Sequence, residues 1–227
     1  MFIDRYDAGQ QLRKKLSSYT DSDAIVCAIP HGGMPISMCV ARDLQLPLEL
    51  MSVQRIVDPI DLTQSVAVVT ETGDYVCNER KVAQVAFDWL LENVEEKWET
   101  ALSKRAQYTN NMPRCSFTDR HVIVVDDGIV TGMTIKAVIK AVQDDGAKKI
   151  TVAVPIASHS LVCWLQKHVD EVVVLEETSE PVVALHPYYK HFPEVFDKEV
   201  MIVWNHARKT QPTAVRWPET PKHKVSV

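Results

Sequence analysis

The sequence is poor in glycine. Only 7 of its 227 residues are glycine, well below the usual ~7% of globular proteins. Four of the seven fall at two places, Gly32 with Gly33 and Gly128 with Gly132. A chain that avoids glycine elsewhere keeps it where the backbone must come close to something. These two places are therefore predicted to be turns that approach a ligand or another segment.

Cysteine is not arranged for a metal or for disulfides. The 5 cysteines are odd in number and show no CxxC spacing, which argues against a zinc site. Cys27 and Cys39 lie among apolar residues and are expected to be buried thiols. This usage favours a reduced, cytoplasmic setting.

The chain also lacks a basic excess and a long apolar run. The net charge of −5 and the pI near 5.9 argue against general affinity for nucleic acid. No apolar run approaches the ~20 residues of a membrane span, and residues 1–16 lack the apolar core of a signal peptide. We therefore expect small-molecule partners, and neither nucleic acid nor membrane.

Apolar strands alternate with amphipathic helices along most of the chain. Its length and its 46% apolar content suit one well-buried domain with an elaboration. The alternation predicts an α/β fold with an open, mainly parallel sheet flanked by helices. The expected strands are 24–29, 48–53, 122–125, 150–156 and 171–175, and the expected helices are 5–16, 35–44, 133–145 and 158–168.

Residues 54–113 interrupt this rhythm. Segment 54–64 has little periodicity and is expected to be a mobile loop. The apolar segments 66–69 and 75–77 flank a turn and predict a hairpin, and 79–108 predicts one long helix. The insertion is therefore interpreted as a helical and hairpin lobe that packs over the sheet edge.

The end of the chain has a different composition. Residues 178–209 contain an aromatic segment and a predicted helix at 197–208, and 210–227 is expected to be a disordered or draped tail. Together with the inserted lobe, residues 1–209 are predicted to form a single domain.

The most informative stretch is 121–134, HVIVVDDGIVTGMT. A continuous β-branched strand leads into two carboxylates, then into a turn of small residues and a helix. Glycines and a helix N-terminus present N–H groups to a phosphate, and threonine hydroxyls add donors. Asp126 and Asp127 would repel a phosphate, so their natural partners are ribose hydroxyls or a divalent cation. The stretch therefore predicts a sugar-phosphate site.

At these residues the sequence resembles the phosphoribosyl diphosphate (PRPP) motif of the type I phosphoribosyltransferases. The resemblance implies that Asp126 and Asp127 hold the ribose hydroxyls and, together with PRPP oxygens, Mg²⁺. It also implies a 5-phosphate loop made of Gly128, Ile129, Val130, Thr131, Gly132, Met133 and Thr134. A homodimer is a further expectation from the family.

The resemblance extends to the second glycine turn, Pro30-His31-Gly32-Gly33. A subgroup of predicted phosphoribosyltransferases carries Pro-Arg-Gly-Gly here, and its N-terminal pattern matches Asp4, Arg5, Ala8 and Gly9. The implied pyrophosphate side is therefore His31, Gly32 and Gly33, with Arg55 closing over it from a mobile loop.

This chain departs from the subgroup at three cationic positions. They carry His31, Gln54 and Thr109 here, although an arginine would offer a permanent charge and a bidentate fork. Arg55, Lys104 and Arg105 are candidate substitutes. The changes leave PRPP binding expected and weaken the case for turnover.

Several side chains have two readings each. His31 is either a pyrophosphate contact or a turn residue with an ordinary hydrogen bond. His159 is either near the ligand or a helix cap. The aromatic residues of the C-terminal segment either stack on an acceptor base or pack against the protein; they are Tyr188, Tyr189 and Phe192.

Three functions are compatible with the motifs. The first is transfer of phosphoribose from Mg-PRPP to a nitrogen acceptor, expected to be a nucleobase, with release of pyrophosphate. The second is a non-catalytic protein that senses PRPP or nucleotides and has lost cationic pyrophosphate contacts. The third is hydrolysis of a phosphorylated sugar or nucleotide, with Asp126 and Asp127 as metal ligands.

Overall fold

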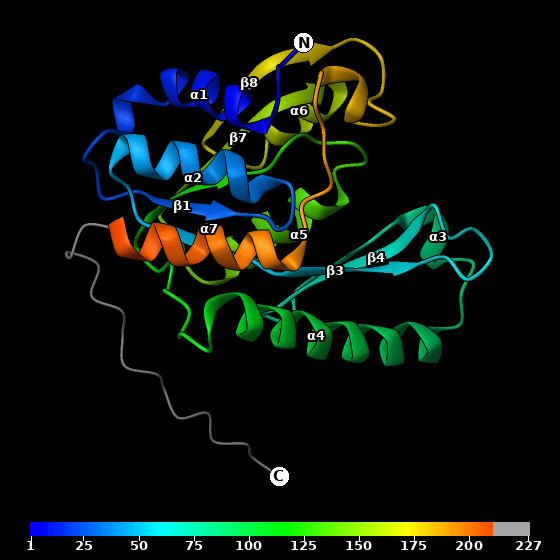
Figure 1. Ribbon diagram of the computed structural model, residues 1–227. Coiled ribbons are helices and arrows are strands. Elements are labelled where there is room, and N and C mark those ends of the chain that lie inside the picture. The colour runs from blue at the N-terminus through cyan, green and yellow to red at the C-terminus, as the bar shows by residue number, and fades with distance from the viewer. Residues whose placement is uncertain (211–227) are drawn as a thin grey trace.

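The computed structural model describes residues 1–210 and is built around a five-stranded parallel sheet (Figure 1). The strand order is β2-β1-β6-β7-β8, and every neighbouring pair is parallel. This confirms the predicted α/β class. The strands are β1 (Ile25–Ala28), β2 (Leu48–Leu50), β6 (His121–Val125), β7 (Lys149–Ser158) and β8 (Glu171–Thr178).

Helices cover both faces of this sheet because its strands are apolar on both sides. Val26 and Ile123 point into the core shared with α1, α2 and α7, whereas Cys27 and Val124 point into the core shared with α5 and α6. The helices are α1 (Arg5–Lys15), α2 (Gly33–Leu44), α5 (Met133–Asp144), α6 (His159–Leu165) and α7 (Asp197–Thr210), with single 3₁₀ turns at η1 (Ser17–Tyr19) and η2 (His186–Tyr188).

Helix α1 is fixed by its cap and by its apolar face. The Asp4 carboxylate accepts the Asp7 backbone N–H at 2.8 Å, as N-cap residues do. Ala8 and Leu12, four residues apart, are completely buried. These contacts hold Arg5, the first residue of the helix, in a defined position.

The inserted lobe has a sheet of its own. Strands β3 (Val53–Val57), β4 (Ser65–Thr70) and β5 (Tyr75–Cys77) pair antiparallel, followed by α3 (Glu79–Val82) and α4 (Phe87–Thr109). The predicted hairpin is confirmed. The predicted loop at 54–64 is wrong in its first part, because 53–57 pairs with β4, and the strand predicted at 48–53 ends at Leu50.

The long helix predicted at 79–108 is broken. Ala86 is extended, with φ −67° and ψ 142°, and precedes the first turn of α4. Apolar residues from both helical parts still share one core, in which Val82, Trp89 and Val94 pack on Ile56 and Leu90. The helical character was therefore predicted correctly, whereas the continuity of the helix was wrong.

Several contacts join the lobe to the main sheet layer, among them an apolar contact and a buried ion pair. Val68 of β4 packs on Met133 and Ala137 of α5. Arg105 of α4 bonds Glu49 of β2 at 3.0 Å. In Figure 1 α4 forms the outer edge of the lobe, and the β3–β4 ribbon lies between α4 and the helices of the main layer.

None of the helices within residues 1–210 is both long and apolar enough to cross a membrane. The tail predicted at 210–227 lies outside the described residues, apart from Thr210, which ends α7.

Candidate active site

Three neighbouring parallel strands end at one edge of the sheet. Strands β2, β1 and β6 are adjacent, so the turns that follow them meet where ligands of α/β proteins collect. A cavity of about 420 Å³ opens there, and it is lined by all three turns, by β3 and by α4. Its lining includes His31, Gly32, Arg55, Tyr108, Asp126, Asp127 and Thr134.

The acidic pair lies at the centre of this edge. Asp127 is 8% exposed, and Arg5 Nε donates to its Oδ2 at 2.9 Å. The Asp127 backbone N–H donates to Asp126 Oδ1 at 2.8 Å. The Tyr189 hydroxyl donates to the Asp127 carbonyl at 2.7 Å. The sequence analysis matched Arg5 only within the subgroup's N-terminal pattern and considered Tyr189 only for stacking on an acceptor base. Neither contact with Asp127 was predicted, because both side chains reach it from distant parts of the chain.

The pKa values of Asp126 and Asp127 are both raised. Burial raises the pKa of Asp126 well above its ordinary value, and the charge of Asp127 raises it further. Burial also raises the pKa of Asp127, although the Arg5 guanidinium opposes this effect. Two adjacent carboxylates with one contacting arginine therefore favour a further cation nearby.

The aromatic segment packs on Arg5. The Arg5 guanidinium carbon lies 3.7 Å from the Phe192 ring centroid, and Arg5 Nη1 donates to the Pro193 carbonyl at 2.5 Å. Tyr189 is buried and its ring contacts Phe2 and Phe192. In this structure the aromatic side chains pack against the protein, which is the second of their two readings.

Segment 128–134 forms a separate cavity of about 380 Å³ that also reaches Asp126 and Asp127. Gly132 has φ +79° and precedes α5, a backbone conformation that suits glycine. Within residues 1–210, the N–H groups of Val130, Thr131 and Gly132 have no hydrogen-bond acceptor. Unsatisfied N–H groups before a helix are suited to an anion.

Two residues of the predicted 5-phosphate loop have side chains buried in the hydrophobic core. Ile129 and Met133 are buried, and the Ile129 N–H donates to the Ile156 carbonyl at 2.9 Å. Their side chains position the loop, whereas the backbone of the loop faces the cavity.

The second glycine turn packs tightly on the acidic pair. A Cβ added at Gly32 would overlap the Asp127 carboxylate, and one at Gly33 would lie 2.9 Å from the Val125 carbonyl oxygen. The sequence predicted a close approach of backbone at this turn. In the structure the approach is to the protein's own acidic pair. The Pro30–His31 peptide bond is cis.

His31 belongs to a polar cluster at the cavity wall. Its Nε2 lies 2.8 Å from Asp197 Oδ1 and 3.0 Å from the Tyr108 hydroxyl. Asp197 also accepts from Tyr108 at 2.6 Å and from Lys104. Burial acts to raise the pKa of Asp197, but hydrogen bonds from Lys104, Tyr108 and His31 lower it well below its usual range. In this structure His31 makes an ordinary hydrogen bond, which is one of its two readings.

Arg55 is placed by a strand and not by a mobile loop. It lies on β3, where its Nε donates to Ser65 Oγ at 2.6 Å and its Nη2 to the Thr63 carbonyl at 3.2 Å. Its side chain lines both cavities that reach the acidic pair. Arg55 thus lies beside the acidic pair, and its predicted place on a loop was wrong because β3 pairs with β4.

Arg105 cannot replace the missing cations. It is 7% exposed and its Nη1 contacts Glu49 Oε1 at 3.0 Å and Glu71 Oε1 at 3.1 Å. This buried group joins the lobe to β2.

His159 is not a helix cap, because Ser158 precedes α6 and His159 bonds Glu177.

Comparison with known proteins identifies the family. A family model described as a phosphoribosyl transferase domain matches residues 5–190. The chain belongs to the type I phosphoribosyltransferase family. The resemblance seen at 121–134 is thereby confirmed.

Two curated relatives and one solved structure are similar over most of the chain. Proteins of two Mycobacterium tuberculosis strains, named "Putative phosphoribosyl transferase" MT0597 and Rv0571c, are 32% identical over 211 residues, which is 92% of this chain and 47% of theirs. The chain thus spans about half the length of these relatives. The crystal structure of TT1426 from Thermus thermophilus is 27% identical, with a TM-score of 0.74, and the match covers 90% of this chain and 98% of that one.

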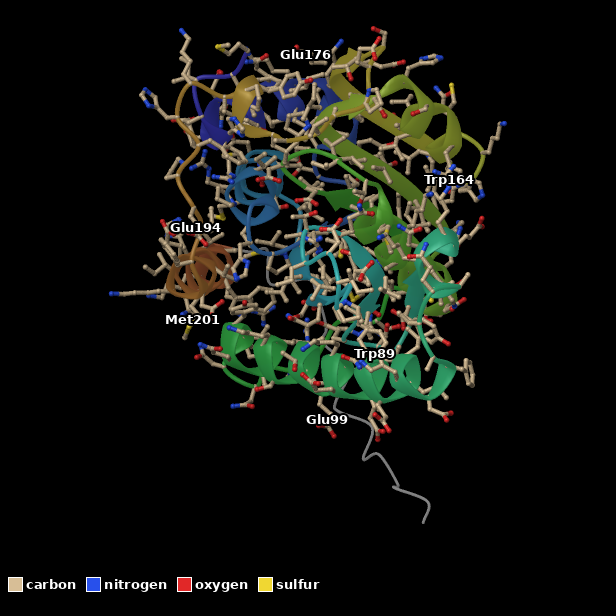
Figure 2. The ribbon with its side chains drawn as sticks, turned by 90° about the vertical axis from the view of Figure 1, so that its right-hand side faces the viewer. Trp89, Glu99, Trp164, Glu176, Glu194 and Met201 are labelled. Carbon is tan, nitrogen blue, oxygen red and sulfur yellow. The ribbon has the colours of Figure 1, made fainter. Side chains whose placement is uncertain are left out.

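A further cavity, of about 570 Å³, also borders His31 and Gly32. It is lined by Arg5, Gly32 and Asp127 and by residues 184–186 and 192–195 of the C-terminal segment. Figure 2 shows Glu194 at the end of α7 that adjoins this segment. Three cavities therefore meet at Asp127, and two of them also reach Asp126.

The donor set at the acidic pair is compatible with Mg²⁺, which the resemblance implies. Phosphate-binding Mg²⁺ sites use one or two carboxylates together with substrate oxygens. Asp126 and Asp127 supply adjacent carboxylates in a cavity wall, and of the two only Asp127 contacts a cationic side chain within residues 1–210, that of Arg5. Residues 1–210 contain no group of three or more His, Cys, Asp or Glu side chains that could hold a metal ion.

Proposed function

We propose that the protein binds Mg-PRPP at Asp126 and Asp127 and transfers phosphoribose to a nitrogen acceptor, a nucleobase, with release of pyrophosphate. The observation that carries this proposal is the meeting of three cavities at one acidic pair. The reaction needs three such compartments around the sugar, for the 5-phosphate, the pyrophosphate and the acceptor. Membership of the family supports the same reaction class.

The 5-phosphate would be held by the loop 128–134. The backbone N–H groups of Val130, Thr131 and Gly132 are free to donate to it, and the first turn of α5 adds the positive end of its dipole. Thr131 and Thr134 line the same cavity and would supply hydroxyl donors. This end of the substrate would be recognised mainly by backbone.

The acidic pair would orient the ribose through its hydroxyl groups. As the C1–O bond to pyrophosphate breaks and the C1–N bond forms, positive charge develops on the sugar ring. Carboxylates fixed next to the ring stabilise that charge without reorganising. Arg5, held by Phe192 and Pro193, keeps the Asp127 carboxylate in place.

The leaving group would occupy the cavity between His31, Gly32 and Arg55. Bound Mg²⁺ would neutralise negative charge on the pyrophosphate, with Asp126 and Asp127 as its protein ligands. Arg55 would add a fixed cation from β3. The acceptor nitrogen would lose its proton in the transfer, and the adjacent cavity beside residues 192–195 would hold the acceptor ring.

The test is a screen of nucleobases for pyrophosphate release from PRPP in the presence of Mg²⁺. Pyrophosphate in proportion to a new N-glycoside is expected for at least one base, and loss of both products is expected in Asp126→Asn/Asp127→Asn. Asp23→Asn, at an exposed position, is the matched control and should keep full activity. Phosphate or ribose 5-phosphate released without any N-glycoside would instead indicate a hydrolase.

A sensing function is the second candidate, and a specific observation favours it. Arg105 is paired with Glu49 and Glu71. His31 and Thr109 occupy positions at which the subgroup has arginine, so few cationic side chains face the proposed pyrophosphate side. Binding of PRPP without pyrophosphate release for any base would select this candidate.

A further inference from the structure

The carboxylate of Asp197 has an unusual set of partners. Three donors from two other segments converge on it: Lys104 and Tyr108 of α4 and His31 of the glycine turn. Lys104 and Tyr108 are four residues apart and so lie on one face of the helix. Figure 2 shows α7, whose Met201 is labelled, lying beside one end of α4, and Asp197 is the first residue of α7.

These donors form a site for an anion. Lys104 contributes a full charge, and the Tyr108 hydroxyl and the His31 imidazole contribute directed hydrogen bonds at 2.6 and 2.8 Å from Asp197 Oδ1. The depressed pKa of Asp197 indicates that the carboxylate is held there in its ionised form. Charge-assisted hydrogen bonds of this kind are the strong ones.

Two of these donors belong to the wall of the candidate active-site cavity, and Lys104 bonds Asp197 beside them. His31 and Tyr108 line the cavity that contains Arg55, Asp126 and Asp127. A second anion entering that cavity could therefore be met by the groups that now bind Asp197. An exchange of one anion for another would leave the donors satisfied throughout.

We propose that Lys104, Tyr108 and His31 form a subsite for the diphosphate group of PRPP and of pyrophosphate, and that Asp197 occupies this subsite until the diphosphate displaces it. The proposal rests on the proposed function for its substrate. It also gives a reason why arginine is dispensable at position 31, because Lys104 supplies the charge from α4. Asp197 then acts as an internal competitor that lowers the apparent affinity for the diphosphate.

The test is calorimetric titration with inorganic pyrophosphate, with and without Mg²⁺, and separately with PRPP. Asp197→Asn removes the competing charge and is expected to bind pyrophosphate about tenfold more tightly than the wild type. Lys104→Met removes a donor and is expected to bind it about tenfold more weakly. Glu99→Gln, an exposed carboxylate of α4 that Figure 2 shows pointing away from the fold, is the control of equal charge change and should bind as the wild type does.

Lys104 and Asp197 form one ion pair, and the subsite predicts opposite changes of pyrophosphate affinity when one or the other is replaced. If the pair were purely structural, Asp197→Asn and Lys104→Met would both weaken pyrophosphate binding. Asp197→Ser provides a second replacement, and circular dichroism confirms folding of each variant. Equal or weaker pyrophosphate binding in both Asp197 variants would overturn the subsite. Tighter pyrophosphate binding in Asp197→Asn and Asp197→Ser, with no PRPP binding in the wild type or any variant, would support the subsite and refute the proposed function.

Discussion

The two ends of the candidate PRPP site are built in different ways. The 5-phosphate end and the acidic pair come from one continuous stretch, 121–134, in which strand, carboxylates, turn and helix follow in order. The pyrophosphate end is assembled from the β1–α2 turn, β3, α4 and α7, which contribute His31, Arg55, Lys104 and Asp197. The first end can be read from local sequence, whereas the second depends on how the lobe and α7 dock.

Substitution of Arg105 should have the largest effect, because Arg105 holds the lobe against β2. Removing one partner of a buried charge pair leaves the others uncompensated, so Arg105→Met should lower the free energy of unfolding by about 3–5 kcal/mol. Urea denaturation measures this change. Arg80→Met, at an exposed site on α3, should change stability by less than about 0.5 kcal/mol. Unchanged stability together with lost PRPP binding would make Arg105 a ligand contact after all.

Gly32 tests whether the two ends depend on each other. A methyl group there would overlap the Asp127 carboxylate, so Gly32→Ala should displace Asp127 from Arg5 and cost about 1–3 kcal/mol of stability. PRPP binding should weaken at least about tenfold, because the carboxylate is misplaced. The double variant Gly32→Ala/Asp127→Ala should recover part of the stability and none of the binding. An additive loss of stability in the double variant would show that the two residues are not in contact.

Glu71 links the lobe to the turn after β2, and its titration is measurable. Its Oε2 accepts the Ser52 N–H at 2.7 Å, and burial raises its pKa to about 7. The folded state therefore binds more protons than the unfolded state between the ordinary value of 4.5 and about 7. Through this group stability falls as pH rises across that window, by at most about 1.4 kcal/mol per pH unit.

Glu71→Gln should remove this component. Thermal unfolding of both proteins from pH 4.5 to 8 measures the difference, and the wild type should lose more stability than the variant as pH rises. Parallel curves for the two proteins would mean that Glu71 titrates near its ordinary value in the fold.

Phe192 should give the smallest effect. Its ring supports the Arg5 guanidinium, and a partly exposed cation–π contact of this kind is worth about 0.5–1 kcal/mol. Phe192→Leu keeps an apolar side chain but loses the ring face, so PRPP affinity should fall about two- to fivefold. A loss greater than about a hundredfold would indicate that the ring itself contacts the ligand.

The sequence predicted those parts of the candidate site whose residues lie close together along the chain. The β-branched strand 122–125, the acidic pair and the helix start after Gly132 were all predicted and are all present. The parallel sheet was also predicted from the sequence, because each of its strands is a short apolar run that alternates with a predicted helix.

The remaining features depend on contacts between distant segments. Arg5 reaches Asp127 across 122 positions, and Tyr189 reaches it across 62, so no local pattern identifies Asp127 as the partner of either residue. β3 was taken for a loop because its polar side chains, Gln54 and Arg55, obscure a strand that β4 stabilises by pairing. Arg105 looked like a free cation because nothing near it in sequence identifies Glu49 as its partner.

The central claim is that Asp126 and Asp127 form a metal-dependent PRPP site, and isothermal titration of the full chain with PRPP, with and without Mg²⁺, tests it most directly. Saturable binding that requires Mg²⁺ and is abolished in Asp126→Ala/Asp127→Ala, but retained in Asp23→Asn, is the predicted result. No binding by the wild type up to millimolar PRPP, with Mg²⁺ present, would contradict the account.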